Sequence, residues 1–153
     1  PEDTLVAALK ALENAGVQIL QCSRIWITEP VPKSDQPDFR NAVAQVQSEL
    51  SARALLDLLH RIEADFGRVR SVQNAPRLLD LDLIAYHDEI VLEAEQGGMI
   101  IPHPRMHQRR FVLAPLCDIA PDWVHPSFGR CAEDLLDDAP DDGDIYPQIA
   151  GAA

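Results

Sequence analysis

The chain has 153 residues, 46% of them hydrophobic and 25% charged, which fits one globular domain with a sizeable core. Its net charge of -12 excludes non-specific binding to nucleic acid, because such binding requires a basic face. No apolar run approaches the roughly 18 residues of a membrane span, and residues 1–3 do not resemble a signal peptide. We therefore expect a cytoplasmic protein that contacts no membrane.

The first half of the chain predicts a helix, two strands and a second helix. Apolar residues recur at helical spacing in residues 3–15, before Gly16. Residues 17–28 and 39–49 have the composition or alternation of strands, and a proline-rich loop separates them. The clearest helix spans 51–66, where Leu55, Leu59, Ile62 and Phe66 form one apolar stripe behind the candidate cap Ser51.

The second half begins with an arginine-rich loop at 68–77 and a predicted strand at 78–86. A turn, a short strand and a glycine pair follow in 87–101, then a short helix at 104–116. This order predicts an α+β fold, with one domain at 1–130 and an acidic C-terminal tail at 131–153. One strand before residue 1 would complete a ferredoxin-like β-α-β-β-α-β core with an antiparallel sheet, so the first strand of that core is absent from the given sequence.

Charge is distributed unevenly along this order. Residues 133–144 contain seven acids and no base, whereas residues 61–110 contain seven of the 13 basic residues, all arginine. A local arginine cluster in an acidic protein favours a polyphosphate ligand. The sequence has no G-x-x-x-x-G-K-[ST], which excludes a P-loop. The three cysteines, Cys22, Cys117 and Cys131, follow no metal-ligand spacing, and we expect reduced thiols that are buried or partly buried.

The strongest chemical signal is the run Leu79-Asp80-Leu81-Asp82-Leu83. On a strand the leucines share one face and the two aspartates the other, with the aspartate Cα atoms about 7 Å apart. Two carboxylates inside an apolar strand are costly to desolvate unless a cation lies between them. Mg²⁺ suits this arrangement, because it takes one or two carboxylates together with substrate phosphates. The alternative is a strand with one solvated face.

Three further groups have a chemical and a structural interpretation. Arg68, Arg70 and Arg77 flank the aspartates and could bind phosphate oxygens or simply be solvated. Phe39 and Asn41 share a strand face and could hold a flat heterocycle, although Phe39 could equally belong to the core. His103 and His107 have an i, i+4 spacing found in some zinc sites but lack a third ligand, so a phosphate contact from His103 is favoured.

These residues resemble the 6-hydroxymethyl-7,8-dihydropterin pyrophosphokinase family of folate biosynthesis. The resemblance rests on four collinear segments, namely residues 36–41, 61–70, 74–83 and 101–116, and it extends from about residue 1 to residue 126. It implies transfer of the pyrophosphoryl group of ATP to the pterin, with release of AMP and with two Mg²⁺ ions. The partners implied are small molecules, and we expect a monomer.

The resemblance also assigns roles to individual residues. It implies that Asp80 and Asp82 bind the metal ions and act in catalysis together with Arg68 and Arg77. The positions implied for ATP are Leu56, His60, Glu63, Arg70, Leu83, His103 and Arg109. The positions implied for the pterin are Thr28, Val31, Phe39, Asn41 and Phe111. Two alternatives stay open: another Mg²⁺-dependent nucleotidyl or phosphoryl transferase, or a non-catalytic nucleotide-binding relative.

Overall fold

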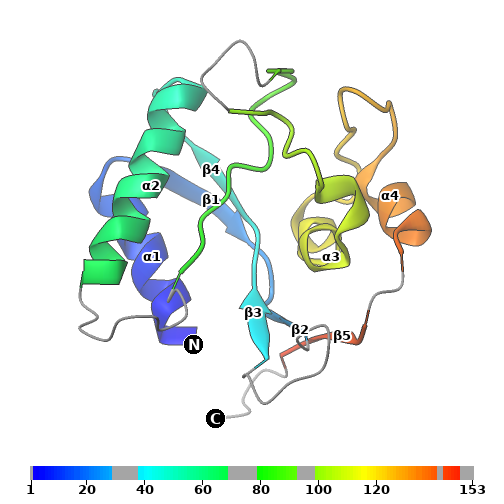
Figure 1. The fold of residues 1–153 in the computed structure, drawn as a ribbon, viewed down its shortest axis with the longest axis horizontal. Coiled ribbons are helices and arrows are strands. Elements are labelled where there is room, and N and C mark those ends of the chain that lie inside the picture. Colours follow the sequence, from blue (N-terminus) through cyan, green and yellow to red (C-terminus); the bar gives the residue numbers. More distant parts are fainter. Residues whose placement is uncertain (1, 29–37, 69–78, 93–98, 141–142, 149–153) are drawn as a thin grey trace. The chain divides into compact units, whose positions relative to one another are not determined.

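The computed structural model describes residues 2–28, 38–68, 79–92, 99–140 and 143–148 (Figure 1). They fall into two compact units, the first from residues 1–19 and 46–103, the second from 20–45 and 104–153. Each unit therefore joins two stretches of chain that are distant in sequence. The regular elements are α1 (Glu2–Asn14), β1 (Gln18–Cys22), β2 (Trp26–Thr28), β3 (Phe39–Asn41), β4 (Ala44–Gln47), α2 (Ala52–Arg68), the 3₁₀ helix η1 (Met106–Gln108), α3 (Arg110–Ile119), α4 (Ala132–Asp138) and β5 (Ile145–Pro147).

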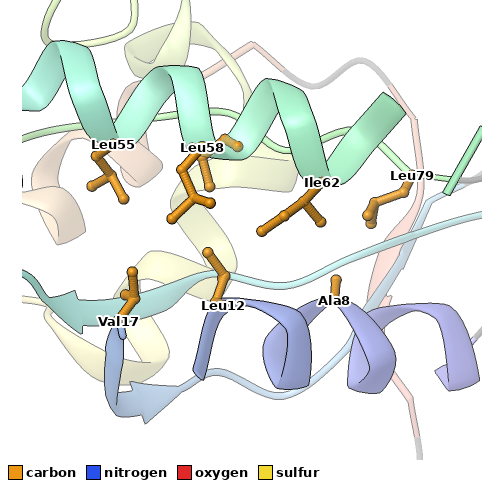
Figure 2. Close-up of a cluster of buried hydrophobic side chains, with 8 residues drawn as sticks. Ala8, Leu12, Val17, Leu55, Leu58, Ile62 and Leu79 are labelled. Carbon is orange, nitrogen blue, oxygen red and sulfur yellow. The ribbon is translucent and has the colours of Figure 1, made fainter. Parts of the chain in front are cut away.

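The first unit is built around the packing of α1 against α2. Ala8 and Leu12 lie one turn apart on α1, and the side chains of α2 that point toward them are those of Leu55, Leu58 and Ile62 (Figure 2). Spacings of three and four residues place these side chains on one face of each helix. Burying a leucine or isoleucine side chain stabilises a fold by about 1.5–3 kcal/mol. The apolar stripes seen in the sequence are therefore the core of this unit.

Local hydrogen bonds define where the two helices start and stop. The Ser51 hydroxyl accepts a hydrogen bond of 3.1 Å from the Ala54 amide, so Ser51 caps α2 as predicted. At the end of α1, Gly16 has φ of +93°, which favours glycine, and its amide donates to the Glu13 carbonyl at 3.0 Å. The chain then turns and buries Val17. Both helices predicted for the first half of the chain are confirmed.

The second unit contains a three-stranded antiparallel sheet in the order β3-β2-β5. Thr28, at the end of β2, pairs with Phe39 of β3 on one side and with Ile145 of β5 on the other. Helix α3 contacts β2, β3 and η1, and α4 packs against α3 and η1. The core side chains of this unit include Met106 and Leu113, both fully buried.

Each of the two long strands predicted for the first half of the chain is divided into two short strands. Residues 17–28 form β1 and β2, and residues 39–49 form β3 and β4, with β1 pairing with β4. At the interruption Ser23 is buried; its hydroxyl accepts from the Val43 amide at 2.9 Å and donates to the Arg24 carbonyl at 2.7 Å. The buried Ser23 therefore links the two breaks, one between β1 and β2 and the other between β3 and β4, which alternation alone does not reveal.

Three other regions differ from the prediction. Residues 79–86 lie outside any strand in the described structure, although burial alternates from Leu79 to Leu83. The helix expected at 104–116 is instead η1 followed by α3, so it starts later and ends later. Beyond residue 131 the acidic segment contains α4 and β5, neither of which was predicted. The structure is thus a mixed α and β fold with antiparallel sheets. Among the described residues, no helix is both long and apolar enough to cross a membrane.

Candidate functional site

The two aspartates of the leucine-rich run lie on the solvent side of the first unit. Leu79 is 6% exposed and belongs to the core, and Leu81 and Leu83 pack against the same core. Asp80 and Asp82 are exposed between them. The alternation predicted from the sequence is confirmed, because every second residue points into the core and leaves the two acids on the opposite side.

Helix α2 holds this segment through a carboxylate. The Leu81 amide, midway between the two aspartates, donates a hydrogen bond of 2.7 Å to Glu63 Oε2. This bond is charge-assisted, and such bonds are stronger than those between neutral groups. Leu56, His60 and Glu63 follow the i, i+4, i+7 spacing and so lie on one stripe of α2. His60 is exposed, whereas Leu56 and Glu63 are half-buried.

His103 is tied to the same segment through its backbone. Its amide donates to the carbonyl of Ile84 at 2.8 Å, two residues beyond Asp82, and the His103 residue is half-buried. Leu83 packs against both apolar clusters of the unit, the second of which contains Met99 and Ile101. Of the positions implied for ATP, Leu56, His60, Glu63, Leu83 and His103 belong to the first unit, whereas Arg109 belongs to the second.

The zinc alternative gains no support from the described residues. His107 packs against Phe128 and His125, with ring centroids 4.7 and 6.4 Å away. His125 is buried, and its Nδ1 accepts a hydrogen bond of 3.1 Å from the Ser127 amide. Burial, and then the neighbouring His107, lower the pKa of His125 below its ordinary value. Within the described ranges, no group of three or more His, Cys, Asp or Glu side chains could hold a metal ion.

The described residues implied for the pterin, namely Thr28, Phe39, Asn41 and Phe111, belong to the second unit. Thr28 and Phe39 are cross-strand partners, and Asn41 Nδ2 donates to Thr28 Oγ1 at 3.4 Å. Phe39 is 54% exposed, which rules out the interpretation of this ring as a core residue. Phe111 lies in the first turn of α3, and the Arg109 guanidinium carbon lies 5.4 Å from the centroid of its ring.

For four of the predicted residues the structure describes no side chain. Val31, Arg70 and Arg77 lie outside the described residues, and Arg68 is described only as the last residue of α2.

Of the three thiols, Cys117 and Cys131 are partly buried as expected, whereas Cys22 is exposed at the end of β1. Burial, followed by neighbouring acids and Cys131, raises the pKa of Cys117 to about 11, so this thiol is a poor nucleophile.

One polar network was not anticipated from the sequence. Asp118, near the end of α3, accepts hydrogen bonds from the Arg24 amide (3.1 Å), from Arg24 Nε and Nη2 (3.1 and 2.9 Å) and from Trp26 Nε1 (2.9 Å). The Arg24 guanidinium also lies over the Trp26 ring, 5.1 Å from its centroid. The helix predicted at 104–116 stops short of Asp118, so no local pattern in the sequence indicated this network.

Comparisons with known proteins give one consistent result. A family profile described as 7,8-dihydro-6-hydroxymethylpterin-pyrophosphokinase matches residues 1–121. The 2-amino-4-hydroxy-6-hydroxymethyldihydropteridine pyrophosphokinase of Haemophilus influenzae is 42% identical over 128 residues, which cover 83% of this chain and 78% of that protein. The protein of the same name from Pseudomonas aeruginosa is 37% identical over 144 residues, covering 94% and 86%. The folic acid synthesis protein fol1 of Pneumocystis carinii is 39% identical over 125 residues, which are 82% of this chain but only 16% of that protein.

Proposed function

The chain belongs to the 7,8-dihydro-6-hydroxymethylpterin-pyrophosphokinase family, and we propose that it transfers the pyrophosphoryl group of ATP to 6-hydroxymethyl-7,8-dihydropterin in folate biosynthesis. In this reaction the hydroxymethyl oxygen attacks the β-phosphorus of ATP and loses its proton. The bond from the β-phosphorus to the oxygen that bridges it to the α-phosphorus breaks, and AMP leaves with that oxygen. The proposal rests above all on the family match across residues 1–121.

Asp80 and Asp82 are proposed as the ligands of Mg²⁺. Their chemistry fits this ion, since Mg²⁺ is commonly held by one or two carboxylates while water and phosphate oxygens complete its shell. Two exposed carboxylates on one side of a segment anchored by leucines leave room for such a shell. When bound, Mg²⁺ would neutralise charge on the phosphates and promote ionisation of the attacking hydroxyl. Two ions are expected from the family resemblance.

The residues of the chain would supply position and charge. Glu63 holds the Leu81 amide and thereby fixes the aspartates on either side of it. Glu63 is itself one of the positions proposed for ATP. The other described positions are Leu56, His60, Leu83, His103 and Arg109. Arg70, outside the described residues, is proposed for ATP as well. Arg68 and Arg77 are proposed to pair with phosphate oxygens, because guanidinium groups bind them in a bidentate manner.

The pterin is proposed to bind in the second unit. Phe39 and Phe111 would stack on its rings, and Asn41 offers one donor and one acceptor to its edge. Thr28 and Val31 are proposed as neighbouring contacts. The exposed Phe39 ring supports this role, since an aromatic side chain left in water gains stability when a flat ligand covers it. A ferredoxin-like core, a single catalytic domain at 1–130, a monomeric state and a cytoplasmic location stay predictions.

Product analysis tests the reaction. Incubation of the chain with Mg²⁺, ATP and 6-hydroxymethyl-7,8-dihydropterin should give AMP and the pterin diphosphate in equal amounts. Release of inorganic pyrophosphate would indicate a nucleotidyl transferase instead. Binding of a non-hydrolysable ATP analogue without any turnover of ATP would indicate a non-catalytic relative.

A further inference from the structure

The Asp118 network, formed by Asp118, Arg24 and Trp26, connects α3 to the strand β2. The hydrogen bonds to Trp26 and Arg24 span 92 and 94 residues of sequence. Four donors converge on one carboxylate whose side chain is 15% exposed, whereas the exposed pair Arg130–Asp138 has a carboxylate side chain that is 65% exposed. Burial alone would raise the pKa of Asp118, but hydrogen bonds from Arg24 and Trp26 outweigh it and lower that pKa. The carboxylate therefore stays ionised and bound to its donors at neutral pH.

Each end of the Asp118 network shares a face of its element with residues proposed for the pterin. One end is Trp26 on β2, and the other is Asp118 on α3. Trp26 and Thr28 are two residues apart on β2 and so share one face of the sheet, and their partners Asn41 and Phe39 share it with them. Asp118 and Phe111 are seven residues apart on α3, which places them on one stripe of the helix about 10 Å apart along its axis. Fixing Asp118 to Trp26 therefore fixes where Phe111 lies along the face that presents Thr28, Asn41 and Phe39.

We infer that Asp118 is a positioning residue for the pterin, which sets α3 against β2 so that Phe111 and the side chains of β2 and β3 are in place before the substrate binds. This inference rests on the proposed function. It assigns no contact with the substrate to Asp118 itself. The substrate gains affinity because the site does not have to order an aromatic ring on binding.

The test compares Asp118→Asn with Asp138→Asn in the full chain. Both changes remove one carboxylate charge that is paired with an arginine of the second unit. We expect Asp118→Asn to raise the Kd of the probe 6-hydroxymethylpterin about tenfold, and to leave the Kd of a non-hydrolysable ATP analogue within about twofold. Asp138→Asn should change neither value. Asp118→Glu, which keeps the charge, should restore most of the pterin affinity.

Trp26→Phe provides a second variant that keeps an aromatic side chain, although a smaller one, and removes the indole N–H donor. Trp26→Phe should also weaken pterin binding. It carries the test alone if Asp118→Asn does not fold. Equal pterin affinities in Asp118→Asn, Trp26→Phe and Asp138→Asn, with a wild-type chain that binds pterin, would overturn this inference alone. An equal loss of pterin and ATP affinity would show a general loss of structure and would also overturn it. A wild-type chain that binds no pterin would overturn the proposed function and this inference together.

Discussion

Two substitutions between residues 79 and 82 should affect different properties. One should lower the stability of the protein, and the other should lower its turnover. Leu79 is 6% exposed in the core between α1 and α2, so Leu79→Ala should cost about 3 kcal/mol of unfolding free energy. For a chain of this size, that corresponds to a melting temperature lower by about 6–12 °C. Asp82 is exposed, so Asp82→Asn should change stability by less than about 0.5 kcal/mol. The same change should lower turnover at least about a hundredfold, because it removes a carboxylate proposed for Mg²⁺.

Thermal melts and a coupled assay for AMP measure the two effects on the same preparations. Asp88→Asn is the matched control, since Asp88 is also an exposed aspartate and lies in the turn at residues 87–88. It should change neither the melting temperature nor turnover. The reasoning is refuted if Asp82→Asn melts as early as Leu79→Ala, or if it turns over normally at saturating Mg²⁺.

Three further predictions concern other residues. Glu63→Ala should lower the free energy of unfolding in urea by about 1–2 kcal/mol, because the Leu81 amide loses its acceptor. Glu63→Gln should lower it less. Equal losses in the two variants would contradict the role of the hydrogen bond. The pKa of His125 is lowered in the folded state, so the protein should lose stability as pH falls below 6.5. His125→Gln should therefore reduce the difference between the melting temperatures at pH 7.5 and 5.5. An unchanged difference would contradict this role of His125. Arg77→Ala should lower the rate of turnover more than pterin affinity, and a loss of pterin affinity alone in equilibrium titration would contradict the proposed contact with phosphate.

The spacing of apolar residues predicted two kinds of segment. In helices every third or fourth residue enters a core, and in extended segments every second residue does. The stripe of α2 and the alternation from Leu79 to Leu83 are examples, and both are set by residues close in sequence. Composition failed beyond residue 131, where the seven acids of residues 133–144 predicted only an acidic tail. Ala132 and Leu135 are nevertheless buried, so two side chains suffice to dock α4 on the second unit. Acidic composition describes the solvent face of such a helix and not its inner face.

Boundaries and the polar contacts of the site depended on residues distant in sequence. The break at Ser23 coincides with its hydrogen bonds to Val43, and α3 continues past residue 116 to include Asp118 and Ile119. The network of Asp118 with Arg24 and Trp26 could not be predicted, because no local pattern links residues more than 90 positions apart. The proposed metal ligands, by contrast, are two residues apart in sequence, so the period of an extended segment was enough to predict that they share one side.

The pairing of β2 with β5 also constrains how the chain matures during its synthesis. Thr28 pairs with Ile145, so on the order of ten seconds of translation separates the two strands at about 5–20 residues per second. Until β5 leaves the ribosome, the nascent chain presents one edge of β2 with unpaired backbone groups, which other chains could recruit. The sheet of the second unit is therefore complete only after residues 145–147 have been synthesised.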